Sequence, residues 1–177
     1  TYITHGIHQY TAKFIPQMPR FFIKKYCENG EVVLDPFCGS GTTLLEANVL
    51  NVNAIGVDIN PLARLISKVK ITSLDVTLLE KSNKKIKEKL RNRIKLSYFV
   101  DLPNKDYWFH KSAIFQLRKI LTIIDELYTS NVIDKDQRDF YLVCVSSIIR
   151  KSSYADPANP KTYCSPRMKI KKEKNIP

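Results

Sequence analysis

The sequence lacks several features that define whole classes of protein. It has no run of about 18 apolar residues and opens with no signal peptide, so we expect neither a transmembrane helix nor export. Its four cysteines include no C-x-x-C pair, which excludes zinc-finger spacing and favours reduced thiols. They are Cys27, Cys38, Cys144 and Cys164. We therefore expect a cytoplasmic protein with no metal site and no membrane partner.

Acidic residues are scarce relative to basic ones. The 177 residues include 29 Lys and Arg but only 17 Asp and Glu, which gives a formal charge of +12 and a sequence pI near 9.5. The hydrophobic share of 44% is that of a globular chain rather than a disordered one. A positive excess of this size indicates a polyanionic partner, usually nucleic acid or an anionic membrane. Solvated lysines on exposed helices would give the same count, so both readings stay open.

Two short apolar segments that each end in an acid predict the first part of the fold. Such runs are typical of buried strands, and the segments after them carry helix-start signals. The expected order is a strand at 31–35, a glycine turn at 36–41, a helix at 42–50, a strand at 53–58 and a helix at 61–70. This order is the first half of a Rossmann-like α/β sheet. Such folds use about five or more strands, so the sheet is incomplete even with a third strand near 71–76.

Local signals mark where the two helices of this half begin. Ser40 or Thr42 is expected to cap the helix at 42–50, because a hydroxyl can accept from a free backbone N–H group. Asn60 and Pro61 supply a cap and a first-turn proline for the next helix.

Beyond residue 74 the sequence becomes basic and helical. Residues 77–97 predict a cationic helix on which Ile86, Leu90 and Ile94 form one narrow apolar stripe. The other predicted segments are a helix at 20–27, a loop at 101–109 that carries Trp108, helices at 112–128 and 134–150, and an extended tail from 152. We expect three parts: a Rossmann-like half at 1–76, a basic helical insertion at 77–151 and an extended basic tail at 152–177.

The segment Asp35-Pro-Phe-Cys-Gly-Ser-Gly-Thr-Thr43 is the candidate site. Its glycines would let the backbone approach a ligand closely, and the helix start at Thr42 offers free N–H groups. Asp58 ends the second strand, where an acid can take ribose hydroxyls. A dinucleotide would need a third glycine, and a P-loop would need Gly-Lys-Ser/Thr. A ligand with ribose but no pyrophosphate, such as S-adenosylmethionine, fits better. The alternative is a tight turn with no ligand.

The same residues resemble motifs of a known family. Residues 35–43 look like motif I of the DNA amino-methyltransferases, which make N4-methylcytosine or N6-methyladenine. Gly56-Val-Asp-Ile-Asn60 resembles their motif II, and His8-Gln-Tyr-Thr-Ala-Lys-Phe-Ile-Pro16 resembles their motif X. The resemblance covers about residues 5–65. It implies the S-adenosylmethionine-dependent methyltransferase fold, with a helical insertion after the cofactor-binding half.

The resemblance also implies roles for individual residues. Asp58 would bind the ribose hydroxyls, and Ile59 would contact the adenine. The residues that would line the methionine and ribose side of the cofactor are Asp35, Phe37, Cys38, Gly39, Ser40, Gly41 and Thr42. The opposite wall would be formed by Tyr10, Lys13 and Phe14. For His5 and His8 we favour capping or hydrogen bonding within an irregular segment over catalysis.

The sequence departs from the family at the catalytic motif. Family members bind the flipped target base through Asp/Asn/Ser-Pro-Pro-Tyr/Phe. Neither Asp156-Pro-Ala-Asn159 nor Cys164-Ser-Pro-Arg167 matches it, so we predict no catalytic residue in this chain. Three explanations are open: an N-terminal piece, a split enzyme whose second chain carries the motif, or a degenerate relative.

The overall interpretation is the cofactor-binding part of a DNA methyltransferase from a restriction–modification system. The basic helix at 77–97 and the Lys-rich tail at 169–174 are expected to contact DNA. Two alternatives are part of an RNA guanosine N2-methyltransferase, which shares the Asp-Pro-Phe-Cys-Gly pattern, and a non-catalytic nucleic-acid-binding module. The choice of cytosine or adenine, the recognised sequence and the oligomeric state are not set by the residues present.

Overall fold

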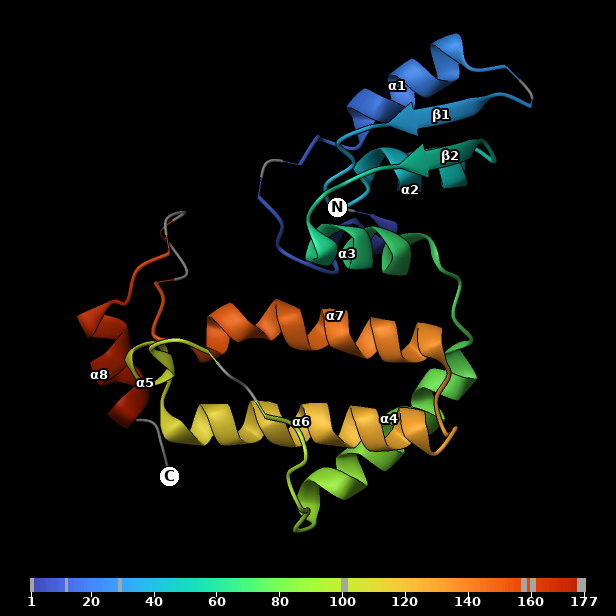
Figure 1. Cartoon of the computed structure of the whole chain (residues 1–177). Coiled ribbons are helices and arrows are strands. Elements are labelled where there is room, and N and C mark those ends of the chain that lie inside the picture. Colours follow the sequence, from blue (N-terminus) through green and yellow to red (C-terminus); the bar gives the residue numbers. More distant parts are fainter. Residues whose placement is uncertain are drawn as a thin grey trace. The chain divides into compact units, whose positions relative to one another are not determined.

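The chain forms two compact units, Thr1–Leu74 and Asp75–Pro177, in a computed structural model (Figure 1). The structure describes residues 2–11, 13–28, 30–99, 102–156, 159 and 162–174, with side chains as far as 171. Several positions of segments discussed above lie outside the described residues, among them 12, 101, 157, 158, 160, 161 and 175–177. Within the described part the fold mixes helices with one small parallel sheet of two strands.

The N-terminal unit contains the predicted succession of strand, turn, helix, strand and helix. Its elements are the 3-10 helix η1 (Ile3–Gly6), α1 (Gln17–Tyr26), β1 (Val32–Asp35), α2 (Thr42–Val49), β2 (Asn53–Gly56) and α3 (Pro61–Ile71). The strands run parallel, with Leu34 opposite Ile55 and Asp35 opposite Gly56. Because the two strands are parallel, their carboxyl ends and the residues that follow them lie at the same edge of the sheet (Figure 1).

Both helices begin where predicted, but the predicted side-chain cap is confirmed only for α3 and is wrong for α2. Asn60 caps α3 by accepting from the backbone N–H of Leu62, and Pro61 occupies the first turn. The cap position of α2 is instead held by Gly41 in the left-handed conformation, with no side-chain hydrogen bond. Ser40 cannot take that role because its hydroxyl faces inward and accepts from the Lys70 ammonium.

The expectation of a third strand near residues 71–76 is also wrong. Ile71 is the last residue of α3, residues 72–75 join no ladder, and α4 (Val76–Arg91) begins directly after them. The cause is the helix-capping residue Asp75, which the prediction from the apolar residues near 71–76 did not take into account. Asp75 accepts from the backbone N–H groups of Thr77 and Leu78, which commits the segment to a helix start.

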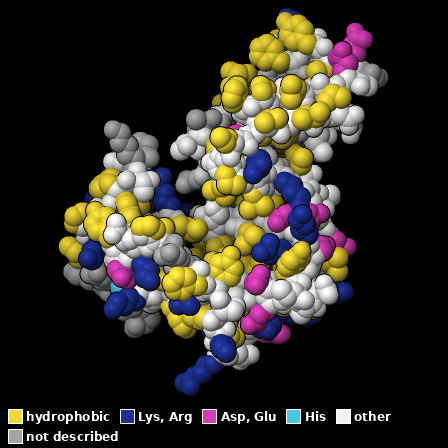
Figure 2. Space-filling model, in the orientation of Figure 1, with side chains coloured by type: hydrophobic (Ala, Val, Ile, Leu, Met, Phe, Trp, Pro, Cys, Tyr) yellow, Lys and Arg dark blue, Asp and Glu magenta, His cyan; other side chains and the backbone are white. Residues whose placement is uncertain are grey.

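Only one face of the small sheet is covered within the N-terminal unit. Helix α2 packs against both strands and against α1 and α3, which buries Leu45, Ala47 and Ile66 completely or almost so. On the other face Leu34 and Ile55 are more than half exposed. An apolar groove of about 400 Å³ between α1 and β1 continues this surface, and Figure 2 shows hydrophobic side chains gathered over these elements.

The C-terminal unit is helical. After α4 come α5 (Lys105–Trp108), α6 (Lys111–Thr129), α7 (Lys135–Ser152) and α8 (Pro166–Lys174). Helices α6 and α7 form an antiparallel hairpin, and α4 packs on α6 (Figure 1). Ile86 is buried in the resulting core, with Leu90 and Ile94 packed against it, as the predicted apolar stripe requires. No helix of the described residues is long and apolar enough to cross a membrane.

Three segments of the C-terminal unit differ from expectation. The predicted loop at 101–109 contains the short helix α5. The cationic helix ends at Arg91 rather than near residue 97, and residues 93–99 are irregular. They lie along α6, where Tyr98 donates its backbone N–H to the Thr122 hydroxyl and accepts from Arg118. The tail expected to be extended contains α8, which starts with the favourable first-turn residue Pro166.

Substitutions of two isoleucines in the N-terminal unit, one buried and one on the exposed sheet face, test which face of the sheet is covered. Replacing Ile66, which has 0% exposure, by Ala is expected to lower the free energy of unfolding by about 2–5 kcal/mol. Ile55→Thr, at a strand position that is 56% exposed, is expected to change it by less than about 0.5 kcal/mol. Urea denaturation followed by circular dichroism measures both. Equal losses would contradict an uncovered sheet face.

Candidate functional site

The turn after β1 contains two glycines, and the surroundings of each restrict the residue type in a different way. Gly39 and Gly41 have φ values of +50° and +73°, a region that favours residues without a Cβ. A Cβ on Gly41 would lie 2.8 Å from the Cβ of Ser67 on α3, so this glycine is required by packing within the protein. A Cβ on Gly39 would lie 3.4 Å from the ring of Tyr10. We expected both glycines to make room for a ligand. For Gly41, packing against Ser67 is by itself a sufficient reason.

Asp58 joins the turn after β1 to the turn after β2. Its Oδ2 accepts from the backbone N–H of Gly39 at 2.8 Å, and its Oδ1 accepts from that of Asn60 at 2.8 Å. Asp35 makes the matching local contact, since its Oδ1 accepts from the backbone N–H of Phe37 at 3.2 Å. The two acids that the sequence singled out thus sit at adjacent strand ends and fix the backbone between them.

The predicted site residues fall into two groups by exposure. Phe37 and Ile59 are 87% and 97% exposed and present apolar side chains near the strand ends. The side chains of Cys38, Ser40 and Thr42 are buried, so at the surface these three residues could offer a ligand little beyond their backbone. Burial also raises the pKa of the Cys38 thiol, which keeps it protonated at neutral pH.

The N-terminal segment contributes two of its three predicted residues to this turn. The Tyr10 ring faces Gly39, and its hydroxyl lies 3.5 Å from the side-chain amide of Asn60. Lys13 Nζ donates to the backbone carbonyl of His5 at 3.1 Å. Phe14 instead lines the apolar groove between α1 and β1.

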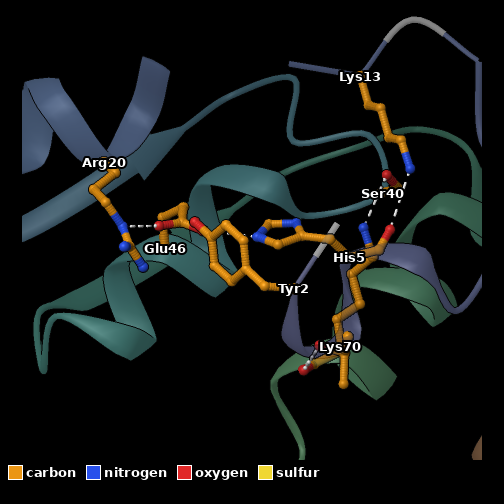
Figure 3. A network of polar contacts seen from close by, with 8 residues as sticks. Tyr2, His5, Lys13, Arg20, Ser40, Glu46 and Lys70 are labelled. Carbon is orange, nitrogen blue, oxygen red and sulfur yellow. Dashed lines mark hydrogen bonds and ion pairs between the residues drawn. The ribbon is translucent and has the colours of Figure 1, made fainter. Parts of the chain in front are cut away.

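A buried carboxylate that sequence reasoning missed holds the N-terminal segment in place. Glu46 on α2 has 0% exposure and accepts from Arg20 Nε at 2.6 Å (Figure 3). His5 Nε2 lies 2.7 Å from its other oxygen, which also accepts from the Tyr2 hydroxyl. The pattern that could have revealed it is a single acid within the apolar run Leu44-Leu-Glu-Ala47, because a helix position surrounded by buried residues does not expose an acid.

The electrostatics of Glu46 favour its charged form. Burial by itself would raise the pKa of this carboxyl, but hydrogen bonds from Tyr2, His5 and Arg20 and the charge of Arg20 outweigh it and hold the pKa below its usual range. His5 therefore has the hydrogen-bonding role expected for it. Since Tyr10 and Lys13 follow on the same segment, the Glu46 contacts also determine where those residues lie.

No metal centre is formed by the described residues, which contain no group of three or more His, Cys, Asp or Glu side chains placed to hold an ion. The arrangement instead suits a polar organic ligand. Parallel strand ends with a glycine turn, an adjacent acid and exposed apolar side chains are typical of nucleotide-type cofactor sites in α/β proteins.

Comparison with known proteins agrees with that class. Residues 2–69 match the family described as DNA methylase. The type II methyltransferase M.MjaII of Methanocaldococcus jannaschii is 46% identical over 77 residues, which are 44% of this chain and 14% of that protein. M.MvaI of Kocuria varians is 30% identical over 162 residues, which are 85% of this chain and 35% of that protein. No solved structure matches.

The site thus has the features of the α/β proteins that bind nucleotide-type cofactors. Within that class the chain belongs to the DNA amino-methyltransferase family. The family model matches residues 2–69, within the N-terminal unit, and the likeness to M.MvaI extends over 162 residues. Enzymes of this family use S-adenosylmethionine. The chain spans about a third or less of the length of these two relatives.

The Glu46 contacts generate a prediction about stability and its pH dependence. Glu46→Gln is expected to lower the free energy of unfolding at pH 7 by roughly 3 kcal/mol, because it breaks a buried ion pair. The pKa of Glu46 is depressed on folding, so its contribution is present above the unfolded-state value of about 4.3 and is lost as the pH falls through the folded-state value.

Urea denaturation of wild type and Glu46→Gln at pH 7 and pH 3 measures both effects, with the exposed Glu31→Gln as the control. The difference between wild type and Glu46→Gln should shrink at pH 3. An equal difference at both pH values would contradict a charged, paired Glu46.

Proposed function

We propose that the N-terminal unit binds S-adenosylmethionine as the cofactor-binding part of a DNA amino-methyltransferase of restriction–modification type. The observation that carries the proposal is the position of Asp58. Asp58 follows β2 by two residues, and its carboxylate accepts from the backbone N–H of Gly39 in the turn after β1. It lies at the edge of the parallel sheet where α/β proteins bind ligands that contain ribose. The proposal includes a Rossmann-like fold, of which β1, α2, β2 and α3 are the first elements.

The residues present suit this cofactor. Asp58 can accept from ribose hydroxyls, and exposed Ile59 offers an apolar surface for the adenine. Phe37 and Tyr10 border the glycine turn, where the methionine side would lie. The wall assigned to the N-terminal segment comprises Tyr10, Lys13 and Phe14, and the remaining contacts come from Asp35 and the backbone of residues 38–42.

When bound, the cofactor supplies an electrophilic methyl group. This chain's own residues hold and orient it, and none of them is proposed to contact the target base, because no Pro-Pro-Tyr or Pro-Pro-Phe motif is present. We therefore propose that methyl transfer to cytosine N4 or adenine N6 requires base-binding residues outside this sequence. A second polypeptide is one source of them.

The distribution of charge supports DNA contact by the C-terminal unit. Of the 29 basic and 17 acidic residues, 22 and 12 belong to Asp75–Pro177, which gives that unit +10 and leaves only +2 for Thr1–Leu74. Helix α4 carries several of the lysines on its exposed side. Lysines so placed can bind phosphates without reading sequence. We propose this surface as the DNA backbone contact.

Calorimetric titration tests cofactor binding. Wild type is expected to bind S-adenosylmethionine and S-adenosylhomocysteine, and Asp58→Asn to bind both at least tenfold more weakly, because the neutral amide is a poorer acceptor for ribose hydroxyls. Asp106→Asn, an exposed position in the C-terminal unit, is the matched control and should bind like wild type. Wild-type affinity in Asp58→Asn would refute the assigned role.

A fluorescence-anisotropy titration of a DNA duplex tests the backbone contact. Binding should weaken with salt, and replacing the exposed residues Lys84 and Lys87 by Ala should reduce the slope of log K against log[salt] by up to about 2. Lys24→Ala on α1 should leave the slope unchanged. DNA binding with no cofactor binding at all would favour the non-catalytic module instead.

A further inference from the structure

A lysine is buried beside the glycine turn without a carboxylate partner. Lys70, on the last turn of α3, is only 2% exposed, and its Nζ donates to the Ser40 hydroxyl at 3.2 Å. A buried ammonium costs free energy unless an opposite charge is near. Burial, with the charge of Lys13, lowers the pKa of Lys70 to about 8, so the cation still predominates at pH 7.

A second ammonium lies close to the first. Lys13 Nζ donates to the backbone carbonyl of His5, and Figure 3 shows the ends of the two lysine side chains meeting between that carbonyl and Ser40. The N-terminus of α2 lies beside Ser40, with no side-chain cap, and adds the positive end of a helix dipole. Three sources of positive potential therefore meet at one point.

All the acids of this unit are engaged elsewhere. Glu46 is paired with Arg20 and His5, and Asp35 and Asp58 accept from backbone N–H groups of the turns. Glu28 and Glu31 lie together between α1 and β1, where the Glu31 carboxylate accepts from the Glu28 backbone. All five are described residues, so no acid of Thr1–Leu74 is left to neutralise the two lysines.

We propose that Lys70 and Lys13 bind the carboxylate of an α-amino acid group, which on the proposed function is the carboxylate of the methionine part of S-adenosylmethionine. A carboxylate has two oxygens and one negative charge, so it can accept from both ammonium groups and lower the cost of burying Lys70. Ser40 directly follows Gly39, which Asp58 bonds, so this group would lie beside the same turn as the proposed ribose site.

The test compares two ligands that differ only in this group. Calorimetric titrations use S-adenosylmethionine and decarboxylated S-adenosylmethionine with wild type, Lys70→Met, Lys70→Arg, Lys13→Met and the exposed control Lys24→Met. Wild type should bind the intact cofactor at least tenfold more tightly. Lys70→Met should lose at least tenfold in affinity for it and less than twofold for the decarboxylated ligand, and Lys13→Met should show a smaller loss of the same kind.

The controls separate the outcomes. Thermal melts monitored by circular dichroism establish that each variant is folded, and Lys70→Arg, which keeps the charge, should retain more selectivity than Lys70→Met. Equal losses for both ligands would mean that Lys70 only holds Ser40, which overturns this inference and leaves the proposed function intact. No binding of either ligand by wild type would overturn both. Displacement of the cofactor by millimolar inorganic phosphate would indicate a general anion site and overturn the carboxylate assignment.

Discussion

The N-terminal unit depends on one buried charge, the Glu46 carboxylate. An apolar helix that covers a sheet would normally exclude an acid, because a desolvated carboxylate without partners is strongly unfavourable. Here Arg20, His5 and Tyr2 converge on it from α1 and from the segment before α1. The charge therefore selects one arrangement of α1 and the segment before it around α2. The position of Tyr10 beside the glycine turn follows from that arrangement.

Sequence reasoning succeeded for most elements whose determining interactions are local, with the cap at Asp75 as the exception. The strands at β1 and β2 follow from short apolar runs, and the start of α3 follows from Asn60 and Pro61, whose contacts span two residues. It failed where tertiary contacts decide. Ser40 looked like a helix cap but bonds Lys70, 30 residues away, and Glu46 shows no pattern that names its distant partners.

For the site, the sequence singled out a turn whose residues do lie together in the structure, but it gave an incomplete reason for those residues. Asp58 and Gly39 do lie together, and the family motifs predicted that they would. The need for Gly41 comes from Ser67, which no local pattern links to it. Lys70 belongs to none of the motifs in the sequence analysis. It stands out only because it is buried. Lysine is usually exposed, so a sequence gives no sign that a particular lysine is buried.

The contacts of Glu46 also join parts of the chain that are distant in sequence. They close loops of 26, 41 and 44 residues. Contacts that are distant in sequence pay a larger loop-closure entropy than the local turns of the helices. The wall that the N-terminal segment forms beside the glycine turn therefore depends on contacts that carry a larger entropy cost than the local helix turns, and the buried charge of Glu46 has to offset that cost.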